Sequence, residues 1–156
     1  MSEQLLPGYE LKIGTGTERA LLIKFMHQTY QELFPEQKDF SHLNETVEKY
    51  FSAQTPLWFV QPITTEIITP IACLWLGNTI DQINGDRHGH IFLVYVSPPY
   101  RQQGIASNLL EYAQEWSASR GDHQISLQVF PNNQVAIKLY QRLGYQTNSL
   151  QMVKAF

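Results

Sequence analysis

The first half of the chain contains two kinds of apolar pattern. One is typical of β-strands and the other is typical of α-helices. Residues 9–13, 57–61 and 67–76 are rich in β-branched and aromatic side chains, which favours strands. Apolar residues recur at helical spacing between 17 and 33 and again between 44 and 51. This half therefore predicts a strand, two helices and two further strands.

The hairpin and helix that follow carry the clearest signals. Asn84-Gly85 predicts a type I′ turn that leads into a strand at 88–96. Ser97-Pro98-Pro99 stops that strand, because proline cannot continue a hydrogen-bonded ladder. Residues 105–119 then repeat apolar side chains at helical spacing, and Gly121 suits the end of a helix.

The last third of the chain alternates strand, helix and strand. Residues 125–130 predict a short strand, 133–143 predict a helix, and 150–154 predict a final strand. Because a helix separates 88–96 from 125–130, these two strands are expected to be parallel. The chain thus predicts an α/β (α+β) fold with a mixed sheet and helices on both faces.

Length and charge narrow the class of protein. A chain of 156 residues fits one compact domain, so we expect 1–156 to form a single domain. The formal net charge is -3 and the sequence pI is about 5.9, so the chain lacks the basic field of a nucleic-acid-binding protein. Its longest apolar runs, 71–76 and 91–96, are too short to span a bilayer. We expect neither nucleic acid nor membrane as a partner.

The start of the chain and its cysteine content bear on location. Residues 1–8 contain no basic region followed by an apolar stretch, so a cytoplasmic location is expected. Cys73 is the single cysteine, which excludes an internal disulfide, and its apolar neighbours predict a buried thiol.

The segment 97–107 combines a strand end, a stiff turn and the start of a helix. At a helix N-terminus, free backbone N–H groups converge on one point, with the positive end of the helix dipole behind them. Gly104 and Ala106 have little side chain to obstruct a phosphate, and Arg101 adds a positive charge. The segment is a candidate anion site, and the alternative is an ordinary strand-to-helix connection with the same Arg-x-x-Gly-x-Ala pattern.

A second motif makes the combination far more specific. Residues 133–145 read Asn-Gln-Val-Ala-Ile-Lys-Leu-Tyr-Gln-Arg-Leu-Gly-Tyr. Together with 101–106 they resemble the GNAT superfamily of N-acetyltransferases. That family carries Arg/Gln-x-x-Gly-x-Gly/Ala after its fourth strand and Asn-x-x-Ala-x-x-Leu-Tyr-x-x-x-Gly-Phe/Tyr in a later helix. The resemblance is strongest over 90–145, and Ala106 stands where glycine is commoner.

The resemblance implies a GNAT fold: a mostly antiparallel sheet of about six to seven strands with a splayed parallel pair around the cofactor. It implies an enzyme that moves an acetyl group from acetyl-CoA directly to a primary amine. Backbone groups at Val94 and Val96 would bind the pantetheine arm, with Asn133 on its other side, and the Val94 N–H would face the acetyl carbonyl. The pyrophosphate would lie on the backbone amides of Arg101, Gln102, Gln103, Gly104, Ile105, Ala106 and Ser107.

By the same resemblance, Tyr140 would contact the cofactor and protonate the departing thiolate. The usual tyrosine pKa of about 10 exceeds the thiol pKa of about 8.5, so the side chain is a weak acid that stays protonated at neutral pH. The alternative role is an aromatic side chain that only packs on a helix face.

His90 is the candidate general base. Some members of the family place a glutamate on the fourth strand, and counting back from Arg101 puts His90 at that position. A neutral imidazole, with a usual pKa of about 6.5, can accept the proton of an amine. On a regular strand His90 shares a face with Phe92, Val94 and Val96. The alternative is a histidine near the end of a hairpin strand with no catalytic role.

Two other patterns are weaker. His88 and His90 share a strand face, but no third ligand is evident, so no metal site is predicted. Gly14-x-Gly16-x-x-Arg19 has arginine where a dinucleotide-binding fingerprint needs its third glycine, so a plain turn is the better interpretation.

The sequence does not define the acceptor. A small amine, a lysine side chain and a protein N-terminus all remain open. Acidic residues such as Glu32 and Asp81 can attract a cationic amine, and Trp58 or Trp75 can line a pocket, although scattered acids are more often solvated surface.

Other functions remain open beside acetyl transfer. One is a non-catalytic sensor or interaction module that binds acetyl-CoA, and another is a nucleotide-binding module that uses Gly14 and Gly16. The final strand at 150–154 leaves room for a homodimer through an exposed sheet edge.

Overall fold

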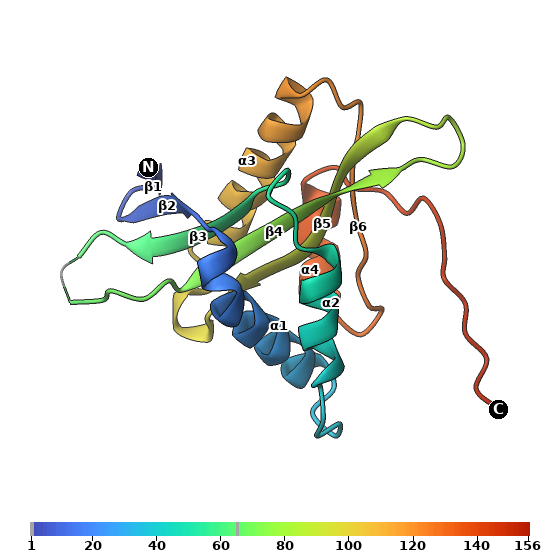
Figure 1. Cartoon of the computed structure of the whole chain (residues 1–156), viewed down its shortest axis with the longest axis horizontal. Coiled ribbons are helices and arrows are strands. Elements are labelled where there is room, and N and C mark those ends of the chain that lie inside the picture. Colours follow the sequence, from blue (N-terminus) through green and yellow to red (C-terminus); the bar gives the residue numbers. More distant parts are fainter. Residues whose placement is uncertain (1, 65) are drawn as a thin grey trace.

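The computed structural model describes residues 2–64 and 66–156 and contains a six-stranded sheet (Figure 1). The strands are β1 (Ser2–Leu6), β2 (Tyr9–Ile13), β3 (Leu57–Pro62), β4 (Ala72–Ile80), β5 (Arg87–Val96) and β6 (Ile125–Leu127). The helices are α1 (Arg19–Leu33), α2 (His42–Tyr50), α3 (Ile105–Ser119) and α4 (Gln134–Arg142), with short 3-10 helices η1 (Gly16–Glu18) and η2 (Pro98–Tyr100).

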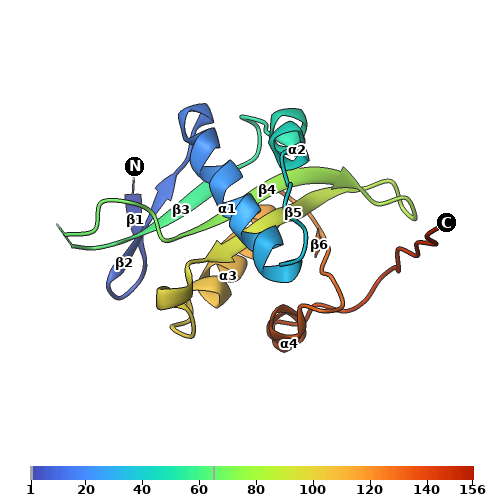
Figure 2. The ribbon, with the colours of Figure 1, turned by 90° about the horizontal axis from the view of Figure 1, so that it is seen from below.

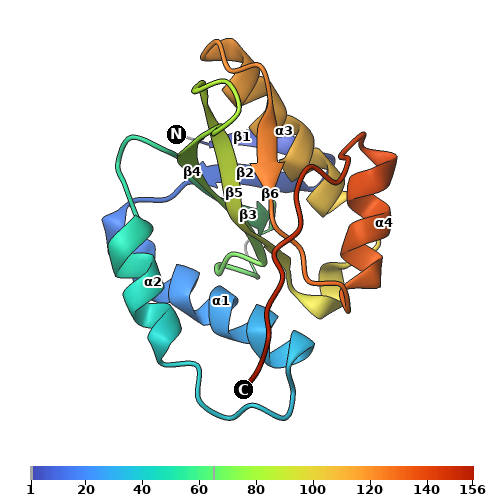
Figure 3. The ribbon, with the colours of Figure 1, turned by 90° about the vertical axis from the view of Figure 1, so that its right-hand side faces the viewer.

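The strand order follows the chain, from β1 at one edge to β6 at the other. Neighbouring strands are antiparallel except β5 and β6, which α3 connects and which are parallel. Figure 3 views the molecule from the β6 side, with β6 beside β5. These findings confirm the mixed, mostly antiparallel sheet and its one parallel pair.

The helices cover both faces of the sheet, as expected. Figure 2 shows α1 and α2 on one face, and α3 and α4 on the other. Side chains of β3 supply both cores, because successive residues of a strand point to opposite faces. Trp58 and Val60 join the core under α3, whereas Leu57 and Phe59 join the core under α1 and α2.

A bulge interrupts β5. Trp75 of β4 pairs with Leu93, but Leu76 pairs with Ile91, so Phe92 is left without a partner on β4. One extra residue in a strand moves every later side chain to the other face. Leu93 accordingly packs into the core under α1 and α2, whereas Ile91 packs under α3.

The bulge corrects the predicted face of β5. His90 and Phe92 lie together, with ring centroids 5.2 Å apart, and Phe92 packs on the α1 side. Val94 and Val96 instead contact the core under α3. The prediction that all four residues share one face is therefore wrong beyond Phe92.

The turn between β4 and β5 lies where Asn84-Gly85 predicts it, but it is not type I′. The connection is longer: the Asp81 N–H donates to the Asp86 carbonyl at 2.9 Å, and the Gly85 N–H donates to the Asp81 carbonyl at 2.7 Å. Within the described residues, Gln102 is the one non-glycine residue with positive φ. Asn84 therefore lacks the left-handed conformation that a type I′ turn requires.

The two ends of the chain differ from the sequence-based expectation. β1 is a strand that the sequence reasoning missed, and it pairs with β2. The strand predicted at 125–130 ends at Leu127. The strand predicted at 150–154 does not form, and Figure 1 shows the segment after α4 extending away from the sheet. An alternating pattern makes a strand only where a sheet edge supplies its hydrogen bonds.

Gly14 and Gly16 belong to a turn that starts α1, as the plain-turn interpretation predicts. The Thr15 side chain caps η1, and the Thr15 N–H donates to the Glu18 carboxylate at 2.7 Å. A Cβ on Gly14 would lie 2.7 Å from the Phe59 ring, so the missing side chain lets the turn approach β3. The Thr15 N–H and the Thr15 and Glu18 side chains are thus bonded to one another, whereas a phosphate-binding turn would need its N–H groups free.

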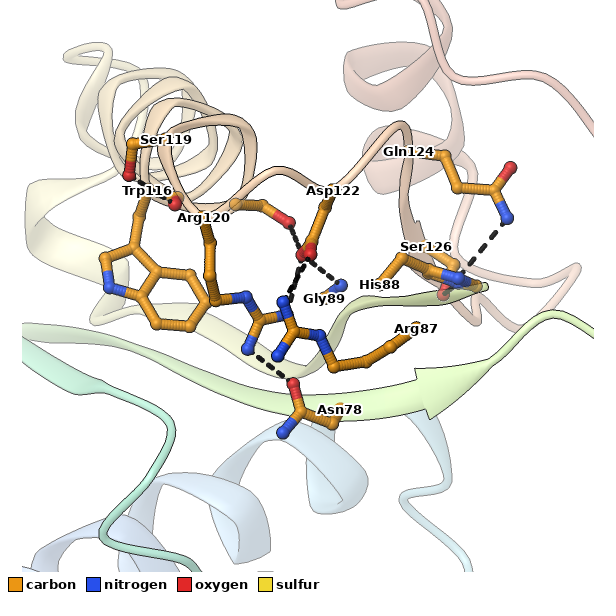
Figure 4. Close-up of polar contacts among 11 residues, drawn as sticks. Asn78, Arg87, His88, Gly89, Trp116, Ser119, Arg120, Asp122, Gln124 and Ser126 are labelled. Atoms are coloured by element: carbon orange, nitrogen blue, oxygen red, sulfur yellow. Dashed lines mark hydrogen bonds and ion pairs between the residues drawn. The ribbon is translucent and has the colours of Figure 1, made fainter. Parts of the chain in front are cut away.

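Asp122 joins the end of α3 to β5 (Figure 4). Its carboxylate accepts hydrogen bonds from the Gly89 N–H at 3.0 Å, Arg87 Nη2 at 3.2 Å, Arg120 Nη2 at 2.6 Å and the Ser117 hydroxyl. Burial on its own raises the pKa of a carboxyl, but the bonds from Arg120 and Ser117 outweigh it and lower the pKa of Asp122 to about 2. The cluster fixes the place where β5 and β6 begin to pair.

Candidate active site

A cleft opens where β5 and β6 stop pairing. Their parallel pairing covers Gly89–Ile91 and Ile125–Leu127, and beyond it the two chain segments separate. Helices α1 and α4 complete the walls. The lining residues are Thr29, Tyr30 and Leu33 of α1, Ile91, Phe92, Leu93 and Val94 of β5, Leu127, Gln128, Val129 and Phe130 of the segment from β6, and Asn133 and Tyr140.

The loop between β5 and α3 presents a run of free backbone amides. Within the described part of the chain, the N–H groups from Gln102 to Ser107 have no hydrogen-bond acceptor. The first backbone bond of the helix is donated by Asn108 to the Gly104 carbonyl at 3.0 Å. Free amides at a helix N-terminus attract anions, so this loop has the donors that a phosphate group needs.

Two residues in the left-handed conformation shape that loop. Gly104 has a φ of 85° and Gln102 has a φ of 63°. A Cβ on Gly104 would meet only the Asn108 amide, at 3.6 Å, so the space in front of this backbone is open. For glutamine the left-handed conformation costs about 1 kcal/mol or more, so the surrounding structure holds the loop in this shape.

Arg101 does not direct its charge toward these amides. Its guanidinium donates to the two Glu32 carboxylate oxygens at 2.9 and 2.8 Å, and Nε donates to the Val96 carbonyl at 2.8 Å. It also lies over the Tyr95 ring, 5.7 Å from the centroid. The charge that Arg101 was expected to add to the anion site is therefore balanced by Glu32. The expectation that the Arg101 N–H belongs to the pyrophosphate-binding amides is wrong, because this group donates to the Pro98 carbonyl at 3.2 Å.

The other predicted residues of the loop have separate roles in its shape. The side chain of Gln103 accepts a hydrogen bond from the Tyr9 hydroxyl at 2.6 Å, which ties the loop to β2. Ile105 is 1% exposed and anchors the first turn of α3 in the core. Ala106 and Ser107 are partly buried at the same turn. The Val96 carbonyl accepts a hydrogen bond from Arg101 Nε at 2.8 Å.

The structure brings Val94, Asn133 and Tyr140 together around the cleft. Asn133 caps α4, since its side-chain oxygen accepts from the Ala136 N–H at 3.3 Å. Its side-chain amide nitrogen points to no acceptor within the described residues and stays available for a ligand. These three positions were predicted from the family resemblance, and they come from β5, the β6–α4 loop and α4.

Tyr140 is a poor acid in this setting. Burial, together with the neighbouring Tyr145, raises the pKa of Tyr140 to about 12. The two rings pack edge to face, 5.8 Å apart. With a thiol pKa of about 8.5, full proton transfer from such a hydroxyl is uphill, so a hydrogen bond to a developing thiolate is what this side chain supplies best.

His90 lies next to the cleft but is not among its lining residues. Its Nδ1 atom is 2.8 Å from the Ser126 hydroxyl of β6. Burial lowers the pKa of His90 below its usual value, and the nearby His88 lowers it further. The ring is therefore neutral at pH 7, the state that a general base requires.

The structure speaks against three of the side chains suggested for the acceptor site, Trp58, Trp75 and Glu32. Trp58 and Trp75 are 3% and 1% exposed, so both are core residues that line no open pocket. Glu32 is paired with Arg101 and is not a free acid for an amine. Asp81 accepts from the Gln124 side chain at 2.7 Å in the hairpin.

Other classes of site find no support in the described residues. None of the helices in 2–64 and 66–156 is long and apolar enough to cross a membrane. The same part of the chain holds no group of three or more His, Cys, Asp or Glu side chains arranged for a metal ion. Cys73 is fully buried, and burial raises the pKa of its thiol far above the usual value, which makes it a poor nucleophile.

Sequence reasoning missed one wall of the cleft. Tyr30 of α1 packs edge to face on Phe130, 5.8 Å away, and Phe34 does the same at 5.0 Å. The Asn132 side chain donates to the Leu33 carbonyl at 3.0 Å. These contacts join segments about 100 residues apart, so no local pattern reveals them.

Comparison with known proteins agrees with this geometry. The profile of the acetyltransferase (GNAT) family matches residues 23–145. The uncharacterized N-acetyltransferase YdgE of Bacillus subtilis (strain 168) is 27% identical over 154 residues, which cover 99% of this chain and 87% of that protein. GCN5-related N-acetyltransferase 6, chloroplastic, of Arabidopsis thaliana is 38% identical over 68 residues, which are 44% of this chain but only 24% of the plant protein.

Solved structures share the fold. A predicted acetyltransferase from Clostridium acetobutylicum with acetyl-CoA has a TM-score of 0.74 and 18% identity, with 94% of this chain and 96% of that chain covered. Aminoglycoside N-acetyltransferase AAC(6')-Iy in complex with CoA has a TM-score of 0.68 and 18% identity, with 100% and 96% covered. With a family match over most of its length, a cleft between splayed parallel strands and a loop of free amides, this chain belongs to the acetyltransferase (GNAT) family.

Proposed function

We propose that the protein transfers an acetyl group from acetyl-CoA to a primary amine, by direct attack of the amine in a ternary complex. One observation carries the proposal: six consecutive amides, from Gln102 to Ser107, are free at the carboxyl end of β5, where the cleft opens. Such a loop fits a pyrophosphate, and the cleft beside it fits a thin polar arm.

We assign the predicted residues to successive parts of acetyl-CoA, first the pyrophosphate and then the pantetheine arm. The pyrophosphate lies on the amides of the loop, and the pantetheine arm enters between β5 and the segment after β6. The N–H groups of Val94 and Val96 face the arm from one side, and the Asn133 amide faces it from the other. Support comes from the lack of any strand paired with residues 93–96 on the β6 side, within the described residues.

The proposed chemistry needs no acyl-enzyme. The amine nitrogen attacks the thioester carbonyl carbon, a C–N bond forms and the C–S bond breaks. The Val94 N–H stabilises the oxyanion, Tyr140 donates a hydrogen bond to the leaving sulfur, and His90 takes the proton that the amine loses. The buried Cys73 supports direct attack, because it is the chain's one thiol and its pKa is raised.

The acceptor is proposed only as an amine-bearing molecule. One relative is the aminoglycoside N(6')-acetyltransferase type 1 of Salmonella typhimurium (strain LT2), which is 32% identical over 69 residues, 42% of this chain and 48% of that enzyme. That similarity supports small amines as the first class to test. Lysine side chains and protein N-termini are the other classes.

The test measures free thiol released from acetyl-CoA in the presence of a panel of primary amines. Gly104→Glu places a carboxylate among the amides, and Gly121→Glu is the matched control. Both glycines have positive φ, and a Cβ on either meets nothing closer than 3.6 Å, but Gly121 lies at the far end of α3. The proposal requires that one class of amine stimulates release and that Gly104→Glu alone abolishes it.

The second candidate is a non-catalytic module that binds acetyl-CoA. The observation that favours it is the lining of the cleft, where none of the described residues is a carboxylate. Tight acetyl-CoA binding without thiol release for any amine, including peptide amines, would favour this candidate over the enzyme.

Organisation and location complete the proposal. We infer that residues 1–156 form a single GNAT domain, since one sheet runs through the described residues and the family profile covers 23–145. We also place the protein in the cytoplasm, which the absence of a disulfide partner for Cys73 supports.

We further infer a homodimer. β6 pairs only with β5 among the described residues, which leaves a sheet edge open. The segment after α4 exposes Leu150 (80%), Met152 (89%) and Phe156 (116%), and its sequence alternates as a strand does. A second copy of the chain can pair this segment with its own β6. Light scattering should give about twice the 18.0 kDa chain mass, and Met152→Asp should give the monomer.

A further inference from the structure

A serine hydroxyl lies between the two histidines of β5. The Ser126 Oγ atom is 3.0 Å from His88 Nε2 and 2.8 Å from His90 Nδ1. Parallel pairing places His90 beside Ser126 in register, so the contact follows from the sheet itself. Both histidines use a ring nitrogen on this one hydroxyl.

The row of polar groups continues to the surface. His88 is only 5% exposed, but its other nitrogen, Nδ1, lies 3.3 Å from the side-chain nitrogen of Gln124. The same nitrogen of Gln124 donates to the Asp81 carboxylate at 2.7 Å. Gln124 is exposed, so the row leads from the side of the cleft to water. Figure 4 shows its outer part, formed by Ser126, His88 and Gln124.

The hydrogen-bond donors in this row are linked. The Ser126 hydroxyl has one proton, so when it donates to one imidazole it accepts from the other. If His90 carries its proton on Nδ1, Ser126 donates to His88 Nε2. If His90 carries it on Nε2, Ser126 donates to His90 and His88 donates to Ser126. A proton added at one end therefore moves the others along the row.

We propose that His90, Ser126 and His88 form a proton relay that carries the proton of the acceptor amine from the cleft to the Asp81 side of the hairpin. The inference rests on the proposed acetyl transfer, in which His90 is the base. Ser126 and His88 act through His90 and are positioning residues. Ser126 and His88, which were not predicted to take part in catalysis, thus complete the path of the proton.

The step balances in protons. The amine N–H bond breaks and the proton binds His90 Nε2, while the Nδ1 proton passes to Ser126 Oγ. The original Ser126 proton passes to His88 Nε2, and His88 releases its Nδ1 proton to water beside Asp81. Gln124 then donates to the vacated Nδ1, which is the contact that the structure shows. After the product leaves, water in the cleft takes the Nε2 proton of His90. The transfers then run in reverse along the row, with water beside Asp81 returning a proton to His88 Nδ1, and the starting tautomers are restored.

Charged groups around the relay favour this direction. Asp81 lies at the outer end, where hydrogen bonds from the Ile83 N–H and from Gln124 lower the pKa of its carboxyl. Asp122 binds the Gly89 N–H between the two histidines. The other charged or titratable neighbours are Arg87 beside His88, Arg120 on Asp122, Tyr50 of α2 packed on Phe92, and Lys49 over the Tyr50 ring.

The first test replaces the bridging hydroxyl. Ser126→Ala should lower kcat by about 10- to 100-fold with an unchanged CoA Kd, whereas Ser126→Thr, which keeps a hydroxyl, should stay within a few-fold of wild type. Ser119→Ala is the matched control, since the Ser119 hydroxyl bonds only the Trp116 carbonyl at the far end of α3. In mixtures of H2O and D2O, a plot of the wild-type rate against the deuterium fraction should be curved. The same plot for Ser126→Ala should be a straight line.

The second test needs no activity. NMR titration of the His90 ring should give a higher pKa in His88→Gln, which removes a neighbouring positive charge, and a lower pKa in Ser126→Ala, which removes the acceptor for the charged ring. Wild-type kcat and isotope behaviour in Ser126→Ala would overturn the relay, and so would a His90 pKa that neither variant moves. If wild type releases no thiol with any amine, acetyl transfer itself fails, and the titration then decides separately whether Ser126 links the two rings.

Discussion

Arg101 and Glu32 join the loop before α3 to the last turn of α1 through two parallel hydrogen bonds of 2.9 and 2.8 Å. The hydrogen bond that Arg101 donates to Glu32 is the largest cause that raises the pKa of Arg101, so the guanidinium stays charged. α1 also forms one wall of the cleft. The motif arginine therefore connects the proposed cosubstrate loop with the proposed acceptor side.

This pairing predicts a mild effect of Arg101→Ala on cosubstrate binding. Because the guanidinium charge is already neutralised, its loss should weaken CoA binding by less than about tenfold, well below the effect of Gly104→Glu. Both side chains are over 40% exposed, so the pair should contribute no more than about 1 kcal/mol to folding. Calorimetry of CoA binding and a double-mutant cycle with Glu32→Ala measure the two quantities. A hundredfold loss of CoA affinity in Arg101→Ala would show that the arginine binds phosphate directly.

Tyr140→Phe tests the role of the hydroxyl in the reaction. Loss of its hydrogen bond to the leaving sulfur should lower kcat by about 100-fold and leave the CoA Kd unchanged. Because the pKa of Tyr140 is raised to about 12, ionisation of this group should cause no fall in kcat as pH rises through the usual assay range. Thiol release measured against pH checks both statements. An unchanged kcat in Tyr140→Phe would make Tyr140 a packing residue.

The Asp122 cluster predicts acid-sensitive stability. A carboxyl pKa lowered from 3.8 to about 2 in the folded protein stabilises folding above the unfolded value, and this contribution is lost as pH falls from about 4 to 2. Asp122→Asn leaves two arginines without their carboxylate and should cost roughly 3 kcal/mol of unfolding free energy at pH 7. Urea unfolding at several pH values should show the difference between wild type and variant shrinking at low pH. Asp86→Asn, in the exposed hairpin, is the control and should have little effect.

The helices were predictable because their signals are local. The range of α3, Ile105–Ser119, is the predicted one, and α4 begins beside the predicted cap Asn133. The loop of free amides was also predictable, since it follows from the helix start and from Gly104. In each case the residues that decide the structure are neighbours in the sequence.

Long-range contacts set the limits of the sequence reasoning. The bulge at Phe92 depends on how β4 and β5 pair, the Glu32 carboxylate reaches Arg101 across 69 positions, and Ser126 reaches His90 across 36. The segment at 150–154 has a strand-like pattern, but among the described residues it pairs with no strand of this chain, not even with the open edge of β6. The motifs predicted where the cleft lies, but contacts between residues far apart in the sequence determine which side chains surround it.

Gly77 provides a test of how the bulge positions His90. A Cβ on Gly77 would overlap the Phe92 ring, which also packs on Trp75 and lies 5.2 Å from the His90 ring, centroid to centroid. Gly77→Ala should therefore displace Phe92, cost about 1 to 3 kcal/mol of unfolding free energy and lower the rate of acetyl transfer by disturbing His90.

The smaller side chain of Phe92→Leu should restore much of the activity when combined with Gly77→Ala, because the added methyl group then finds space. Gly16→Ala is a suitable control, since a Cβ there would meet only the Arg19 side chain, at 3.5 Å, and its φ is not positive. Chemical denaturation and thiol release measure the two effects. Wild-type stability in Gly77→Ala would show that Phe92 has another place for its ring and that the bulge does not fix His90.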